Sequence, residues 1–291
     1  EYFIYLRKIV TSMPYDKFNG FLFSNPKFFD VNYKINPYMH GSVDKYKSWS
    51  EWSKIVYKFR KYNRSVHAVD YQTYDRGKRN IENLPDVVFV ANHAMPVPDD
   101  GFILANMNDK EREPEPYYFN EWADYNDYNV RTINENLSFE GCGDAKWHPE
   151  ENKVWMGHGI RTDEQAVNRV DDMINAEVEK LELQTDDYYH LDVCFEPLGK
   201  NEAVYIPEAF SSDSAQKIEN AFDNLIEVCD EDKETMGGNC ALIEKNRVFI
   251  DKVNNCTAKK LRSEGYKTVH VDTEEFMKAG GSVDCLFLRV P

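Results

Sequence analysis

The sequence lacks several features that would assign it at once to a large class of proteins. No apolar run among its 291 residues approaches the roughly 18 to 20 residues that span a bilayer. No Ser- or Gly-rich linker and no low-complexity segment divides the chain, and the polar stretches 96–100 and 106–116 are short enough to be loops. We therefore expect a soluble globular protein with a single domain, residues 1–291.

Positive charge is also scarce. The chain has 51 acidic and 35 basic side chains, which gives a formal net charge of −16. Such a charge repels phosphate backbones and attracts cations. We therefore expect a small-molecule ligand, drawn in by its positive charge, rather than a nucleic acid or a membrane.

The cysteines form no CxxC pair. Six of them are spread along the chain, at Cys142, Cys194, Cys229, Cys240, Cys256 and Cys285. This spacing argues against a disulfide framework and against a zinc ribbon. Reduced thiols in the cytoplasm are the expectation. No signal peptide is visible at the N-terminus, which begins at Glu1, so a removed leader stays open.

Short apolar runs alternate with helical patterns along the chain. The runs suited to strands are 87–90, 154–156, 188–195, 203–206, 240–243, 248–250, 268–271 and 285–290. Apolar residues at a spacing of three and four predict helices over 43–61, 163–183, 212–228 and 257–264, with Asp163, Ser212 and Thr257 near their starts as N-caps. This alternation favours an α/β architecture, but periodicity does not separate a doubly wound sheet from a propeller of small α/β units.

Cys285 differs from the other cysteines in its neighbours. The pair Gly280 and Gly281 precedes it, and an apolar run follows it. Glycine tolerates positive φ and the close approach of a ligand, so the pair leaves room beside the sulfur. A buried unpaired cysteine more often behaves as a small hydrophobic residue, so this segment alone does not establish a nucleophile.

Two other segments carry polar groups suited to chemistry. Alternation places His190 on one face with Asp192 and Cys194, although a lone histidine on a strand is more often a hydrogen-bonded core residue. Glu140 and Asp144 stand four apart across two glycines, in a tight loop that brings both acids to one point. An acidic turn that only binds water or caps a helix explains this loop equally well.

Together these groups could cleave a guanidinium group. A guanidinium is a planar cation with five N–H donors, and two carboxylates can orient it. A thiolate can attack its central carbon, while a histidine protonates the departing nitrogen. This chemistry needs no metal and no other cofactor.

Five separated motifs resemble, in order, those of the guanidino-group-modifying enzymes, which include arginine deiminases, dimethylarginine dimethylaminohydrolases and amidinotransferases. The motifs lie at 25–39, 84–94, 139–144, 189–195 and 280–286, with a supporting match at 157–163. The resemblance implies the pentein fold, an α/β propeller of five ββαβ units around a pseudo-fivefold axis. The active site would then lie in the central channel.

The resemblance also implies a role for each site residue. Cys285 would be the nucleophile, His190 the general acid and base, and Glu140 the carboxylate that partners the histidine and the substrate. The implied substrate-binding residues are Asn36, Asn92, Arg112, Asp144, Arg161 and Ala279. Among these, the aspartate would hold the guanidinium. The two arginines would hold the substrate carboxylate, which suits the planar fork of arginine.

The asparagine Asn92 distinguishes members of the family. Many deiminases and dimethylarginine hydrolases have an aspartate there, whereas the segments around Asn36 and Asn92 look most like those of arginine dihydrolases, which convert arginine to ornithine, ammonia and carbon dioxide. An amide has donor and acceptor atoms, so it can bind the cationic guanidinium and later the neutral ureido group.

The expected function is therefore that of an arginine dihydrolase. The alternative within the family is a dimethylarginine dimethylaminohydrolase or an arginine deiminase, which would release citrulline. A protein of another class, a catalytically silent sensor of arginine, would bind arginine without producing ammonia. The sequence is also compatible with a homo-oligomer.

Three features depart from the resemblance or limit it. His93 follows Asn92 where relatives carry a small residue, and it could crowd the substrate or point outward. Asp284 would raise the pKa of Cys285 if it faced the site, but alternation places it on the other side. Some relatives carry a fused ornithine cyclodeaminase domain, for which the chain has no room after Cys285, so the step to proline is not expected.

Overall fold

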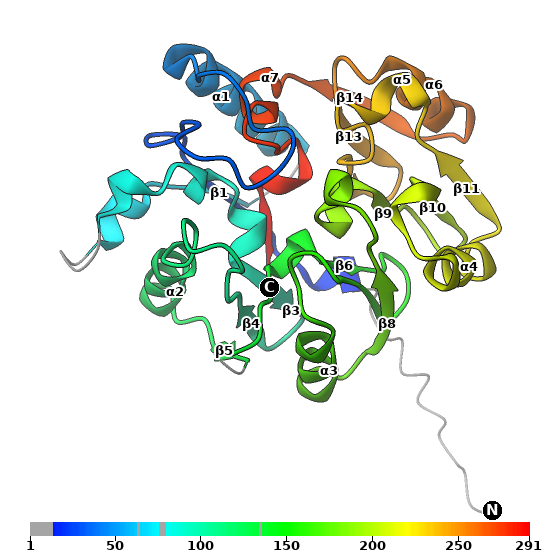
Figure 1. Ribbon diagram of the computed structural model, residues 1–291, viewed down its shortest axis with the longest axis horizontal. Coiled ribbons are helices and arrows are strands. Elements are labelled where there is room, and N and C mark those ends of the chain that lie inside the picture. Colours follow the sequence, from blue (N-terminus) through cyan, green and yellow to red (C-terminus); the bar gives the residue numbers. More distant parts are fainter. Residues whose placement is uncertain (1–13, 63–64, 76–79, 134–135) are drawn as a thin grey trace, which may run out of the picture.

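The computed structural model describes residues 14–62, 65–75, 80–133 and 136–291. Within them the strands form five three-stranded sheets around a central axis, with the longer helices on the outside (Figure 1). In each sheet one outer strand is antiparallel to the middle strand and the other is parallel to it. A helix makes the crossover that a parallel pair requires. The predicted propeller of ββαβ units, the pentein fold, is confirmed.

Four of the units follow one another along the chain. One contains β3 (Ala94–Val97), β4 (Gly101–Leu104), α2 (Glu115–Tyr125) and β5 (Val130–Thr132). The next contains β6 (Ala145–Trp147), β7 (Lys153–His158), α3 (Glu164–Met173) and β8 (Glu177–Glu182). Then come β9 (Phe195–Pro197), β10 (Glu202–Tyr205), α4 (Ser212–Ala221) and β11 (Asn224–Glu227). The last of the four contains β12 (Ala241–Glu244), β13 (Arg247–Asp251), α6 (Asn255–Ser263) and β14 (Lys267–Val271).

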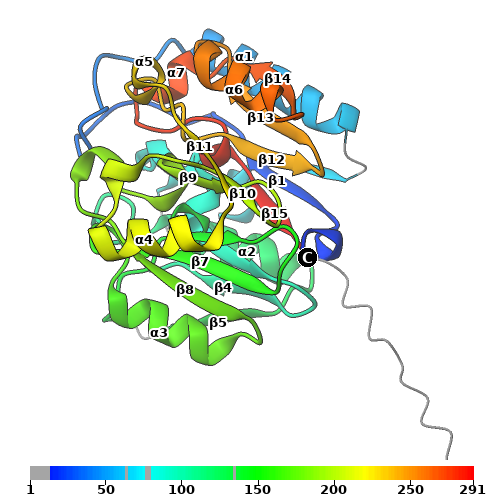
Figure 2. The same cartoon turned by 90° about the vertical axis from the view of Figure 1, so that its right-hand side faces the viewer.

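The remaining unit is assembled from the two ends of the described chain. It joins β15 (Leu288–Val290) to β1 (Gly20–Ser24), α1 (Lys45–Tyr62) and β2 (Val66–Val69). The register of the antiparallel pair sets Leu288 opposite Leu22, and Figure 2 shows the two strands side by side. This pairing closes the ring and fixes the segment just before β15, which contains Cys285.

Short 3₁₀-helices lead into the first strand of four units. These are η5 (Val90–His93) before β3, η6 (Gly141–Gly143) before β6, η8 (Leu191–Val193) before β9 and η10 (Asp284–Leu286) before β15. Before β12 the chain forms α5 (Asp230–Lys233) and then a turn in which the amide of Asn239 donates to the carbonyl of Met236 at 3.0 Å. The other short helices are η1 (Pro14–Lys17), η2 (Tyr71–Tyr74), η3 (Ile81–Asn83), η4 (Pro85–Val88), η7 (Asp186–Tyr188), η9 (Pro207–Ala209) and α7 (Glu274–Met277).

Some of the predicted strands are wrong. Residues 87–90 fall in η4 and η5, and residues 188–195 form η7 and η8 before β9 begins. Most side chains of these runs are buried whichever way they point, so they carry no periodicity that separates a helix from a strand. The run 285–290 is a strand only at its end, whereas the other five runs are strands as predicted.

Two predicted helices are too long. The patterns over 163–183 and 212–228 each continue from a helix into the parallel strand that follows it, β8 or β11. Asp163 takes the N-cap position of α3 as expected. For α4 the cap is Ser211, whose hydroxyl accepts a hydrogen bond from the amide of Ser214 at 3.3 Å. Thr257 lies inside α6 rather than at its start.

Aromatic side chains hold the closing strand against α1. The ring of Phe21 in β1 meets those of Phe59 and Phe287 at centroid distances of 5.2 and 5.4 Å, both edge to face. Pairs of this kind contribute about 0.5–1.5 kcal/mol each beyond the burial of their area. None of the described helices combines the length and the apolar character needed to cross a membrane.

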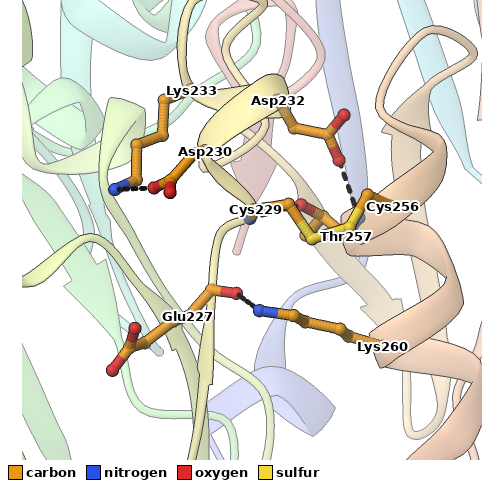
Figure 3. The surroundings of a disulfide bond; sticks show 8 residues. All are labelled: Glu227, Cys229, Asp230, Asp232, Lys233, Cys256, Thr257 and Lys260. Carbon is orange, nitrogen blue, oxygen red and sulfur yellow. Dashed lines mark hydrogen bonds and ion pairs between the residues drawn. A yellow bond between two sulfur atoms is a disulfide. The ribbon is translucent and has the colours of Figure 1, made fainter.

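A disulfide joins Cys229 to Cys256, at a sequence separation of 27 (Figure 3). The expectation of reduced thiols throughout is therefore wrong for this pair, and the argument for a cytoplasmic location loses its support. Cys229 precedes α5 and Cys256 lies in α6, so only the fold brings them together. Beside the bond, Asp232 Oδ2 accepts the amide of Thr257 at 2.6 Å.

Replacing both Cys229 and Cys256 by serine should lower the free energy of unfolding by about 3 kcal/mol, because a crosslink closing a loop of this length restricts the unfolded chain. Urea unfolding with and without a reductant measures this change. The reductant should bring the parent protein to the stability of the double variant and leave the variant unchanged. A parent protein that is insensitive to reductant would show that the bond is absent.

Candidate active site

The segment after α7 brings Cys285 into the ring. Gly280 has a φ of +88°, in the left-handed region that favours glycine, and a Cβ there would lie 2.5 Å from Asn36 Oδ1. The hydroxyl of Tyr189 donates to the carbonyl of Gly280. The glycine therefore permits the close approach that the sequence suggested, and the group that approaches is the amide of Asn36.

The sulfur of Cys285 is buried between two polar side chains. The thiol donates to Asp192 Oδ2 at 3.2 Å and accepts a hydrogen bond from Asn239 Nδ2, also at 3.2 Å. Burial, followed by the negative charge of Asp192, raises the pKa of the thiol well above its usual value. The resting sulfur is therefore protonated, and a positive charge beside it would favour the thiolate.

His190 and Glu140 form a buried pair. Nε2 of His190 lies 2.7 Å from Glu140 Oε2, and Glu140 Oε1 accepts the amide of Asn108 at 3.0 Å. Burial opposes the charged imidazole, but the negative charge of Asp144 and the hydrogen bond to Glu140 outweigh it and raise the pKa of His190. Burial also acts to raise the pKa of Glu140, yet the hydrogen bond and charge of His190 lower it from 4.5 to about 2. The two shifts together favour the form in which the pair is an imidazolium and a carboxylate.

Asp144 supports this pair with both of its oxygens. Oδ1 accepts the amide of Leu191 at 3.0 Å, and Oδ2 accepts the hydroxyl of Thr162 at 2.7 Å. Asp144 thus fixes the turn that follows His190 and adds negative charge near the imidazole. Each oxygen thus accepts one hydrogen bond within the protein and keeps a further acceptor site, and a role of Asp144 in holding the guanidinium stays a prediction.

Asp192 presents a free acceptor beside the sulfur. Its Oδ2 receives the thiol of Cys285, whereas its buried Oδ1 has no hydrogen-bond partner among the described residues. Burial raises the pKa of Asp192 to about 7. A buried unpaired acceptor costs about 1–3 kcal/mol, so it marks a place where a ligand donor is expected. The sequence had placed Asp192 beside His190 without giving it a role toward the substrate.

The amide of Asn92 has a fixed orientation. Its Oδ1 accepts Nη1 of Arg112 at 3.1 Å, and Arg112 is held in turn by Glu115 at 2.7 Å. The buried Nδ2 of Asn92 has no hydrogen-bond partner among the described residues. A Cβ on Gly143 would lie 2.5 Å from this nitrogen and 3.1 Å from ring carbons of His190, so amide and imidazole border the same small space.

His93 points away from that space. Its Nε2 lies 3.2 Å from Glu115 Oε2, in full burial. Burial lowers the pKa of His93, so the ring is neutral at pH 7. Of the two orientations considered for His93, the outward one is found, and the histidine supports the carboxylate that holds Arg112.

The N-terminal loop, residues 25–40, is tied to the site. Asn36 and Ala279, both expected to bind substrate, are joined by a hydrogen bond from Asn36 Nδ2 to the carbonyl of Ala279 at 3.1 Å. Arg161 Nη2 donates to the carbonyl of Ile35 at 2.7 Å. The amide of His40 donates to a carbonyl of the segment after α7 at 3.0 Å. The loop and the nucleophile segment are therefore held together.

Arg161 links the loop to Glu140. Its Nη1 pairs with Asp109 and lies 3.7 Å from Glu140 Oε1, and its guanidinium lies over the ring of Tyr189, 5.1 Å from the centroid. Arg161 is buried, and its planar group meets these partners from several sides. A role of Arg161 in holding the substrate carboxylate stays a prediction.

Asp86 offers a second unpaired acceptor, and the sequence gave no signal for it. Its Oδ2 accepts the hydroxyl of Tyr33 at 2.9 Å, while its buried Oδ1 has no hydrogen-bond partner in the described part of the chain. Burial raises the pKa of Asp86 to about 7, against the charge of Arg112. Asp86 and the arginines thus form a region of both charges, suited to an amino acid.

The side chain of Asp284 is engaged away from Cys285, although both residues lie in η10 rather than in an alternating strand. It pairs with Lys146, whose Nζ also lies 2.5 Å from Glu196 Oε2. All three side chains are buried. The ammonium group of Lys146 therefore offsets the negative charge that Asp284 brings close to Cys285.

Replacing Glu140 by glutamine should lower the pKa of His190, because the negative charge and the charge-assisted hydrogen bond that hold its proton are lost. In the parent protein, the stability contributed by the proton on His190 is fully present below pH 6.5, the ordinary pKa of histidine. This contribution is lost as the pH rises through the raised pKa of His190. Titration of the histidine resonances by NMR measures the shift. His148, which accepts backbone amides outside the site, provides an internal control. An unchanged His190 would contradict the pairing.

Comparisons with known proteins agree with this geometry. A family described as N,N dimethylarginine dimethylhydrolase, eukaryotic, matches residues 36–290. The bifunctional arginine dihydrolase/ornithine cyclodeaminase AgrE of Nostoc sp. is 33% identical over 276 residues, which cover 93% of this chain and 37% of AgrE. The N(G),N(G)-dimethylarginine dimethylaminohydrolase of Mycobacterium tuberculosis is 29% identical over 270 residues, which cover 91% of this chain and 83% of that protein.

A solved structure shows the same fold. The N-terminal domain of ArgZ, covalently bound to a reaction intermediate, matches with a TM-score of 0.86 and 29% identity, over 94% of this chain and 97% of that chain. This chain thus spans well under half of the bifunctional relative AgrE and nearly the whole of the ArgZ domain. The matched sequence, the five-unit fold and the arrangement of Cys285, His190 and Glu140 lead to one assignment: the chain belongs to the eukaryotic N,N-dimethylarginine dimethylhydrolase family of the guanidino-group-modifying enzymes.

Proposed function

We propose that the protein hydrolyses the guanidino group of arginine through a covalent adduct on Cys285. The observation that carries the proposal is one buried site that contains a thiol, an unpaired carboxylate oxygen on Asp192 and the charged pair of His190 and Glu140. A guanidinium cation fits the free acceptor beside the sulfur, and its charge would favour the thiolate. Relatives point the same way, since AgrE has been solved with L-arginine and the ArgZ domain with its substrate and its product.

The unpaired groups suggest how arginine lies in the site. Its guanidinium would donate to Asp192 Oδ1, next to the sulfur. Its α-ammonium would donate to Asp86 Oδ1, the other free acceptor, and its carboxylate would lie against Arg161. Asp86 and Asp192, whose pKa values are raised, would each meet a positive charge of the substrate, which favours their ionised form.

The first chemical step forms a carbon–sulfur bond. When the guanidinium is bound, the thiol of Cys285 passes its proton to Asp192 Oδ2, its hydrogen-bond acceptor, and the sulfur electron pair attacks the guanidino carbon. The imidazolium of His190 gives its proton to one nitrogen, the carbon–nitrogen bond breaks, and ammonia leaves. Glu140 keeps the imidazole of His190 oriented while the charge of the imidazole changes.

The second step breaks the carbon–sulfur bond. His190, now neutral, takes a proton from a water molecule, whose oxygen attacks the carbon of the adduct. The sulfur leaves with the bonding electrons and takes its proton back from Asp192, the new hydroxyl group gives its proton to solvent, where ammonia becomes ammonium, and citrulline remains. Repetition of the two steps on the ureido group would release a second ammonia and leave a carbamate on the ornithine nitrogen. Protonation of that nitrogen and cleavage of its bond to the carbamate carbon would release carbon dioxide and give ornithine.

Asn92 favours this second cycle. Because Arg112 occupies its oxygen, the free atom of Asn92 is an N–H donor. A ureido oxygen accepts such a hydrogen bond, whereas an aspartate at this place would present another acceptor and repel it. We therefore propose an arginine dihydrolase.

A dimethylarginine dimethylaminohydrolase is the second candidate, because the family match and the Mycobacterium tuberculosis relative carry that description. The leaving group separates the two. Dimethylarginine would yield dimethylamine and citrulline, whereas arginine yields ammonia.

Incubation with arginine should release two molecules of ammonia and one of ornithine per turnover, measured by an ammonia assay and mass spectrometry. Cys285→Ser should reduce the rate at least about 10⁴-fold, because the attacking sulfur is gone. Cys142→Ser is the matched control, since this free cysteine lines a separate small cavity with Tyr15 and Lys146, and it should stay active. Binding of arginine without release of ammonia would contradict the proposal and indicate a sensor of arginine.

Asn92→Asp should stop the reaction at citrulline. The added carboxylate still attracts a guanidinium, but it repels the ureido oxygen, so the ratio of ornithine to citrulline should fall at least about tenfold, equivalent to about 1.4 kcal/mol. Product analysis over time measures this ratio. If Asn92→Asp forms ornithine as fast as the parent protein, the asparagine does not select the second cycle.

A further inference from the structure

The central residues of the site come from equivalent places in different units. Asn92 precedes β3, Glu140 precedes β6, His190 precedes β9 and Cys285 precedes β15, each within a few residues of the first strand of its unit. One unit, that of β12, is missing from this set. The residue at the equivalent place, two before β12, is the buried Asn239.

Asn239 makes three hydrogen bonds through its side-chain amide. Nδ2 donates to Cys285 Sγ at 3.2 Å and to the carbonyl of Asp192 at 3.0 Å. Oδ1 accepts the amide of Asp284 at 2.9 Å. The side chain therefore joins the nucleophile, the residue before it and the backbone of the aspartate that receives the thiol.

These partners determine which way the amide points. The backbone amide of Asp284 is only a donor, so the atom facing it must be the oxygen of Asn239. The carbonyl of Asp192 is only an acceptor, so the atom facing it must be the nitrogen. The second N–H of that nitrogen is left for the sulfur, and a rotated amide would break two hydrogen bonds.

We propose that Asn239 is a catalytic residue that donates a fixed N–H to the sulfur of Cys285 and stabilises its anionic form. Other titratable groups near this sulfur are Asp192, Asp284 and Tyr189, and the aspartates, when ionised, oppose the anion. The neutral N–H donor of Asn239 therefore stabilises the anionic sulfur, which the surrounding charges do not. The inference rests on the proposed function only for its role in turnover, because the hydrogen bond to the sulfur is a property of the free protein.

The segment that carries Asn239 is rigidly held. The amide of Gly237 donates to the carbonyl of Asp232 at 2.8 Å, and the disulfide of Cys229 anchors the start of α5. A Cβ on Gly238 would lie 2.3 Å from the carbonyl oxygen of Val193, so this turn packs directly against η8. The donor is thus in place before substrate arrives.

The same segment provides a matched control. Asn254 is also a buried asparagine, and it holds the segment through Thr235, whose hydroxyl donates to Oδ1 at 2.6 Å and whose carbonyl accepts from Nδ2 at 3.0 Å. The hydrogen bonds of the Asn254 side chain within the described part of the chain go to Thr235 and not to the sulfur. Replacing it removes comparable hydrogen bonds from the same turn and leaves the donor to Cys285 present.

The experiment measures the rate at which iodoacetamide alkylates Cys285, followed by mass spectrometry of its peptide between pH 6 and 10. Asn239→Ala should lower the rate at neutral pH about 10- to 100-fold and move the profile about one unit or more upward, because a hydrogen bond to a charged group is lost. Asn239→Asp, whose side chain has nearly the same shape, should move the alkylation profile to still higher pH. With arginine, kcat should fall and KM should change little.

Asn254→Ala should lower the melting temperature and keep the alkylation profile of the parent protein. Equal shifts in Asn254→Ala and Asn239→Ala would overturn the proposal, since Asn239 would then only hold the turn. A folded Asn239→Asp variant that keeps the alkylation profile of the parent protein would also overturn the proposal, whether or not arginine is hydrolysed. A shifted profile in a protein that does not hydrolyse arginine would support Asn239 and reject the proposed function.

Discussion

The pairing of β15 with β1 is the constraint on which the site depends. It joins the last strand to the first described strand and closes the ring of five sheets. Closure fixes η10, and with it Cys285, against turns that belong to other units, so that the sulfur meets Asp192 and Asn239. Residues far apart in the chain thus share one buried space because each precedes the first strand of its own unit.

Within this space, charges are arranged in compensated groups. His190 is paired with Glu140, Arg112 with Glu115, and Lys146 with Glu196 and Asp284. A buried charge is tolerated only when such partners are present. The exceptions are therefore informative. The free oxygens of Asp86 and Asp192 and the free N–H of Asn92 remain where a small, charged ligand would satisfy them.

The sequence located the proposed reacting groups but not all of their contacts. Cys285, His190 and Glu140 were recognised from local motifs, and the structure brings them into one site with the histidine paired to the glutamate. The hydrogen bonds of Asp144 to Thr162 and to the amide of Leu191 could not be predicted, because spacing shows which residues share a loop but not which atoms are hydrogen-bonded. Asp192 stood next to a recognised residue, whereas Asp86 and Asn239 carried no local signal.

What the sequence by itself determined is the family, the alternation of strands with helices, and the chemical types gathered in its motifs, because these depend on residues close together in the chain. Only the tertiary structure decided that Cys229 and Cys256 are joined, that most of 87–90 and half of 188–195 lie in 3₁₀-helices, and that the amides of Asn92 and Asn239 each present a donor. The reason is physical: a hydrogen-bond donor is free or engaged according to its neighbours in space, and here those neighbours come from other units of the ring.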